Sequence, residues 1–108
     1  MATSKEFHDY ILECLCRAGN VSTRKMMGEY LVYFNGRLAG DICDNCLLLK
    51  QTEASLRLLP NAEKEYPYEG SKTLMLVVED VENKELMRQI INEMYPQLPE
   101  SVSKKRKN

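Results

Sequence analysis

The chain has 108 residues, a net charge of −1 and an apolar fraction of 44%, which predict one globular domain with a core of its own. Its longest apolar runs are only a few residues, as at positions 74–78, far short of the roughly 20 residues that span a membrane. Residues 1–18 lack the features of a signal peptide. We therefore expect a cytoplasmic protein whose four cysteines are reduced.

The charge is distributed unevenly. Lys104, Lys105, Arg106 and Lys107 make the C-terminus basic, and the rest of the chain has 11 basic and 16 acidic residues. Duplex nucleic acid is bound mainly by neutralising its phosphates, so an acidic body is a poor nucleic-acid binder. The four terminal cations have no aromatic stacking partner beside them and predict at best weak, salt-sensitive binding.

Taken in chain order, the first predicted element is a helix. Thr3 and Glu6 fit a capping box, so the helix is expected to begin at about Ser4. Gly19-Asn20 follows its last turn, where glycine is favoured. Between these points apolar residues recur at helical spacing and predict a core-facing stripe: Phe7, Tyr10, Ile11, Cys14, Leu15 and Ala18.

Three strands are expected next, over residues 23–34, 37–43 and 46–50. Asn35-Gly36 separates the first two, and both of its residues tolerate the positive φ of a type I′ turn. Asp44-Asn45 is the second tight turn. The pattern predicts an antiparallel meander.

The second half of the chain predicts a short helix, a polar loop, a strand and a last helix. Their expected ranges are 52–59, 61–72, 73–79 and 83–95, with stops at Pro60 and Pro96. The fold class is therefore α+β, with the order α-β-β-β-α-β-α and the first and last helices packed on one antiparallel sheet. We expect a single domain over residues 1–96 and a disordered basic tail over 97–108.

The strands offer apolar side chains to both faces of this sheet. Tyr30, Val32 and Phe34 alternate with Leu31 and Tyr33, whereas the helices can cover only one face. An exposed patch of several hundred Å² is typical of an interaction site. A symmetric homodimer is the commonest way to bury it, and a different protein using the same surface is the alternative.

Part of the sequence resembles a known family. The run Thr23-Arg24-Lys25-Met26-Met27-Gly28, the strands about Asn35-Gly36 and the run Leu47-Leu48-Leu49-Lys50 are similar to the opening motif of the N-terminal domain of the TfoX (Sxy) family of bacterial competence regulators. The likeness covers about residues 21–95. It differs at Met27, where the family has Phe, and in the cysteines of the 43–46 turn.

The resemblance implies a two-layer α+β domain similar to the secretion-chaperone fold, whose members commonly pair as dimers. It also implies a role in competence-type transcriptional regulation.

Cations at the strand ends are the candidate partner-binding residues. Arg24 and Lys25 begin the first strand, and Lys50 ends the third, so we consider a contact with an anion or an acidic partner at one sheet edge. The alternative is solvated charges, with Arg24 paired to a carboxylate such as Glu29 or Glu79. Gly28 joins the candidate site as a bulge or a close approach of backbone to a helix.

Metal binding and catalysis find less support. Cys43-x-x-Cys46 has the spacing of a zinc half-site, but Cys14 and Cys16 point to nearly opposite sides of their helix and cannot complete it. His8, the single histidine, has no nucleophile at a recognisable spacing. We therefore expect no metal, no cofactor and no enzymatic activity.

The sequence thus predicts a small regulatory or adaptor module that acts through protein contacts, with a partner that the residues do not identify. The alternative is a regulator that binds nucleic acid directly through the basic tail and Arg24-Lys25. A third possibility, an enzyme or metal protein built on Cys43 and Cys46, has the least support.

Overall fold

The computed structural model describes residues 3–26, 29–67 and 70–99. These contain the helices α1 (Lys5–Cys16), α2 (Glu53–Leu58), α3 (Lys84–Met94) and the 3₁₀ turn η1 (Tyr95–Gln97). The strands are β1 (Val21–Met26), β2 (Glu29–Phe34), β3 (Arg37–Cys43), β4 (Cys46–Leu49), β5 (Lys64–Glu65) and β6 (Met75–Val78). None of the described helices is both long and apolar enough to cross a membrane.

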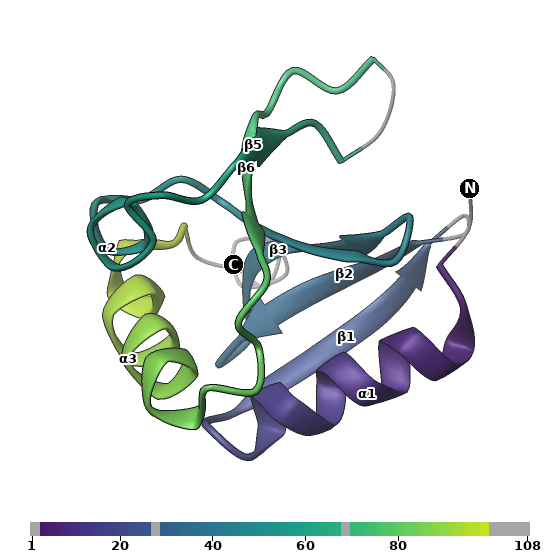
Figure 1. Ribbon diagram of the computed structural model, residues 1–108, viewed down its shortest axis with the longest axis horizontal. Coiled ribbons are helices and arrows are strands. Elements are labelled where there is room, and N and C mark those ends of the chain that lie inside the picture. The colour runs from purple at the N-terminus through teal and green to yellow at the C-terminus, as the bar shows by residue number, and fades with distance from the viewer. Residues whose placement is uncertain (1–2, 27–28, 68–69, 100–108) are drawn as a thin grey trace, which may run out of the picture.

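The described strands form one six-stranded sheet in the order β1-β2-β3-β4-β6-β5. Every neighbouring pair is antiparallel. Helices α1 and α3 lie on one side of the sheet, and the segment around β5 projects as an arm on the side away from α1 (Figure 1). The predicted α+β class, with the first and last helices on an antiparallel sheet, is confirmed.

The segment predicted as a single strand over residues 23–34 is two strands. β1 and β2 pair as a hairpin, from Met26 opposite Glu29 to Val21 opposite Phe34. The reversal is hard to see in the sequence because β-favouring residues flank it and Gly28 is its only strong turn residue. The prediction for Gly28 itself lies outside the described residues. The hairpin makes β1 an edge strand and places its side chains beside those of β2.

Both predicted tight turns are present. Asn35 and Gly36 have φ values of 51° and 85°, and Asp44 and Asn45 have 52° and 56°, the left-handed conformation that the primed hairpin turns require. The second turn also contacts the start of α1, because the backbone N–H of Ser4 donates to the Asn45 side chain at 3.0 Å.

The helix caps follow the sequence closely. α1 is capped by Ser4, one residue after the predicted Thr3, and the Ser4 hydroxyl accepts from the N–H of Phe7 at 3.1 Å. α3 is capped by Asn83 as predicted, and α2 begins with a capping box between Thr52 and Ser55. Each cap satisfies N–H groups that a helix start would otherwise leave unpaired.

The main core lies between the sheet and the helices. One face of the strands, which we call the covered face, packs against the apolar stripes of α1 and α3. Its largest fully buried side chains include Phe34, Ile42, Leu47 and Leu49 from the strands and Ile11, Leu15, Ile90 and Met94 from the helices.

The end of the described chain belongs to the fold. After α3 the chain makes η1, and Leu98 is buried in the main core. Arg37 at the start of β3 fixes this segment, since its guanidinium donates to the carbonyls of Tyr95 at 3.2 Å and Leu98 at 3.1 Å. The packed part of the described chain therefore reaches Leu98, two residues past Pro96.

The outer face of the sheet as the candidate binding surface

The face of the sheet opposite the helices, here called the outer face, is defined by one row of paired residues. Arg24, Leu31, Asp41, Leu48 and Val77 are successive register partners across β1, β2, β3, β4 and β6. Side chains alternate between the two faces of a strand, so paired residues lie on the same face. A second apolar cluster of Cys43, Leu48 and Met75, with Cys46 and Val77 packed against it, lies here.

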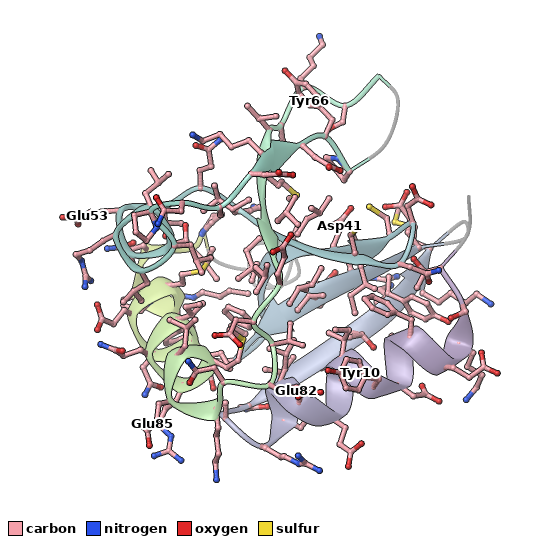
Figure 2. All side chains as sticks on the ribbon, in the orientation of Figure 1. Tyr10, Asp41, Glu53, Tyr66, Glu82 and Glu85 are labelled. Atoms are coloured by element: carbon pink, nitrogen blue, oxygen red, sulfur yellow. The ribbon has the colours of Figure 1, made fainter. Side chains whose placement is uncertain are left out.

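Asp41 is the unusual member of this row. It is an acidic residue, but it is only 4% exposed and its register partners on both sides are leucines. Figure 2 shows its side chain on the side of β3 away from α1. Burial and an interaction with the Glu29 carboxyl raise the pKa of Asp41 to about 7, and Lys50 opposes the shift. Two carboxyl groups and one lysine thus meet within an apolar surface.

The arm covers part of the outer face. The thiol of Cys43 donates to the carbonyl of Pro67 at 2.9 Å, and both residues are buried. Burial raises the pKa of Cys43 to about 12 and also raises the pKa of Cys46. Both thiols are therefore held in the protonated form, which is neither nucleophilic nor a good metal ligand.

Cys43 and Cys46 are register partners on either side of the Asp44-Asn45 turn. No group of three or more His, Cys, Asp or Glu residues suited to a metal ion occurs in the described part of the chain. The prediction that the cysteine pair forms no zinc site stays a prediction.

The predicted partner-binding cations do not form one patch. Arg24 lies on the outer face and Lys50 acts on Asp41 there, whereas Lys25 is exposed on the other side of β1. Among described residues, no ion pair joins Arg24 to Glu29 or to any other carboxylate, and Glu29 interacts with Asp41. The tail cations at positions 104–107 lie outside the described residues.

His8 holds α1 to the covered face. Its ring stacks on Tyr30 with a centroid separation of 3.8 Å, and its Nε2 lies 2.8 Å from Oγ1 of Thr23. Nδ1 lies 2.9 Å from the Asp9 carboxylate. The order of atoms is that of a hydrolase triad, but the His8 side chain is only 12% exposed and its ring is stacked on Tyr30, so we assign His8 a packing role.

Among the described residues, two shallow clefts lie beside β6. One, of about 270 Å³, runs between α1 and the β4–β6 pair and includes Phe7 and Tyr10. The hydroxyl of Tyr10 donates to Glu82, which raises the pKa of Tyr10 to about 12, and Figure 2 shows the two side chains close together. The other, of about 330 Å³, lies between the end of α2 and β6 and includes Glu63, Glu79 and Asp80.

The sequence reasoning missed Asp41 and named Glu29 only as a partner for Arg24. Asp41 stands in an apolar strand between Gly40 and Ile42, and a charged residue pointing inward from a strand is a signal that could have drawn attention to it. Its interaction with Glu29 could not be found in the same way, because it depends on the register of β2 against β3.

The fold and this surface define a small α+β domain with helices on one face of an antiparallel sheet. Residues 13–106 match the sequence model of the TfoX N-terminal domain, and the chain therefore belongs to that family.

Comparison with curated proteins finds a relative in Spirochaeta aurantia, described as an uncharacterized 12.7 kDa protein in the trpE 5′ region. It is 28% identical over 107 residues, covering 99% of this chain and 93% of the relative. No solved structure matches the chain significantly.

Proposed function

We propose that this protein is a cytoplasmic regulatory or adaptor module that works through protein contacts, in transcriptional control of the competence type, and not as an enzyme. The observation that carries the proposal is the outer face, where apolar side chains stay partly accessible beside a buried carboxyl group. Membership of the TfoX N-terminal domain family supports the part of the proposal that assigns the protein to competence-type regulation.

The composition of the outer face suits a protein partner. Leu31 and Tyr33 are half-buried on β2, and Met26 at the end of β1 is 51% exposed on the same side of the sheet. Aromatic residues, methionine and arginine are enriched at the centres of protein interfaces. The outer face combines these with Arg24 and a carboxyl pair, which would give a partner a defined orientation.

Direct binding to nucleic acid is the weaker candidate. Arg24 and Lys25 point to opposite sides of β1, so they supply single cations and not a patch. On the outer face the carboxyls of Glu29 and Asp41 lie close together and would repel phosphates. The alternative thus depends mainly on the tail cations at positions 104–107.

A matched pair of substitutions tests the proposal. Leu31→Ser removes apolar contact area from the outer face, and Leu56→Ser makes the same change on α2, where Leu56 is 42% exposed. A protein retained from the native cell would be identified, purified and titrated against both variants and the wild type.

We expect Leu31→Ser to weaken binding by roughly tenfold or more, the scale of one well-packed interface residue, and Leu56→Ser to leave it unchanged. Equal binding of the three proteins would contradict the proposal. So would retention of duplex DNA in place of protein at physiological salt.

A further inference from the structure

The outer face carries a charge arrangement that is complementary to itself. In the defining row, Leu31 on β2 is the register partner of both Arg24 on β1 and Asp41 on β3. Neighbouring strands are about 4.8 Å apart, so the cation and the carboxyl lie at similar distances on either side of Leu31. A two-fold axis along β2 above Leu31 would carry Arg24 of one copy over Asp41 of the other, and the reverse.

We propose that the partner of the outer face is a second copy of this chain, with Arg24 of each copy bound by the half-buried Glu29 of the other, beside the buried Asp41. The inference rests on the proposed function, because it names the partner for the same surface. It specifies a symmetric dimer in which each copy contributes one cation and one carboxyl pair.

The charges of a single copy are incompletely matched. The exposed side chain of Arg24 makes no ion pair or hydrogen bond among the described residues. Glu29 and Asp41 lie together at an apolar surface, where Lys50 is the one cation that acts on Asp41. Two like charges at such a surface are costly, and an arginine from a second copy would relieve that cost through charge-assisted hydrogen bonds.

The apolar residues fit the same arrangement. Leu31 would meet its own equivalent at the axis, and Tyr33 lies two positions along the same strand on the same face. Sheets pack face to face about 10 Å apart with interdigitating side chains. The central contact would therefore be apolar, with the charge pairs on either side of it.

The arm is compatible with this dimer. β1 and β5 are at opposite edges of the sheet, and the arm projects on the outer side near the β5 edge (Figure 1). The proposed axis therefore places the arm of one copy beside the β1 edge of the other. Three or four strands of this length cover only a few hundred Å² in each copy, so we expect affinity on the order of micromolar.

A charge-swap experiment tests the proposal by sedimentation velocity at about 1 to 200 µM, a range that brackets micromolar affinity. The proteins are the wild type, Arg24→Glu, Glu29→Arg, an equimolar mixture of these two variants, and Lys25→Glu. In the last variant the same charge is reversed on the neighbouring residue, which faces the other side of the sheet.

The wild type should pass from the monomer mass of 12.5 kDa to twice that mass as its concentration rises. Each single reversal creates two like-charged contacts per dimer and should weaken dimerisation by roughly a hundredfold. The mixture should recover much of the dimer, because the glutamate introduced at position 24 of one variant then meets the arginine introduced at position 29 of the other, while the second contact keeps the wild-type Arg24 and Glu29. The recovery should be incomplete, since Asp41 stays unchanged beside both contacts. Lys25→Glu should behave as the wild type.

A wild type that stays monomeric over the whole range would overturn the proposal, and so would dimers of the single variants as strong as its own, or a mixture that does not recover. If circular dichroism shows a reversed variant to be unfolded, Arg24→Gln replaces it and should weaken the dimer by roughly tenfold. A monomeric wild type that binds another protein through Leu31 would leave the proposed function intact and refute only the dimer.

Discussion

Asp41 is the residue that most distinguishes the outer face from an ordinary solvated sheet. It is buried between two leucines and beside Glu29, which together raise its pKa to about 7 from an ordinary value of 3.8. A buried carboxyl that is neutral at low pH and charged above neutrality costs stability only in its charged form. Retaining such a group in a core strand is the kind of local conflict that marks a functional position.

The first prediction concerns the pH dependence of stability. The folded protein holds the Asp41 proton more tightly than the unfolded chain, so the free energy of unfolding should fall as pH rises from about 4 to 7 and stay lower above 7. Asp41→Asn removes the ionisation. Its free energy of unfolding should depend less on pH than that of the wild type, by on the order of 1–2 kcal/mol between pH 5 and 8 after allowance for solvent screening.

Urea denaturation of both proteins at submicromolar concentration, where self-association does not contribute, measures this difference. Parallel pH profiles for wild type and Asp41→Asn would show that the carboxyl is already ionised and solvated in the folded protein.

At the scale of the elements, the backbones of strands β3 and β4 come into close contact at Gly40. A Cβ placed on Gly40 would lie 2.0 Å from the backbone oxygen of Leu48 and 3.0 Å from the Cα of Leu49. Backbone atoms cannot move aside as a flexible side chain can, so only glycine allows this approach.

We therefore expect Gly40→Ala to cost roughly 3 kcal/mol or more, or to prevent folding altogether. Thermal unfolding followed by circular dichroism would measure this cost. Cys46→Ala, at the other end of the same hairpin and half-buried, is a suitable control and should cost much less. Equal melting temperatures for Gly40→Ala and wild type would mean that the strands separate without penalty.

Elements that depend on local signals were predictable from the sequence. Asn35-Gly36 and Asp44-Asn45 adopt the left-handed conformations that their residue types favour, and Asn83 caps α3 with a hydrogen bond to the N–H of Leu86. In each case the decisive interaction lies within about three residues.

Features that depend on pairing between distant segments were not predictable. The β1–β2 reversal lies within a continuous run of β-favouring residues, so the sequence does not mark it. Strand β5 falls in a segment predicted to be a loop, because it is a strand through its pairing with β6 and not through its own residue types. The interaction of Glu29 with Asp41 likewise depends on the register of β2 against β3. The stacking of His8 on Tyr30 depends on where α1 lies on the sheet. Tertiary context overrides local preference in such cases.

At the scale of the whole molecule, the two functional hypotheses assign binding to different parts of the chain. Protein binding is assigned to the acidic body, and nucleic-acid binding mainly to the basic C-terminus. If the folded body binds protein through its outer face, removal of residues 103–108 should leave the melting temperature and partner affinity unchanged. Binding of duplex DNA by the full chain should be weak and should fade as salt rises, since only four tail cations are available. Titration of both chains against protein and DNA at two salt concentrations checks this. Tight DNA binding at physiological salt that disappears with the tail would favour the alternative.

Photo-crosslinking from single positions in living cells is the measurement that tests the central claim most directly. A photoreactive amino acid would replace Leu31 on the outer face in one strain and Leu56, exposed on α2, in another. Mass spectrometry would then identify every product. The account predicts a specific protein adduct at position 31, formed with a second copy or with one other protein, and none of comparable yield at position 56. Equal labelling at the two positions, or no protein adduct at position 31, would contradict it.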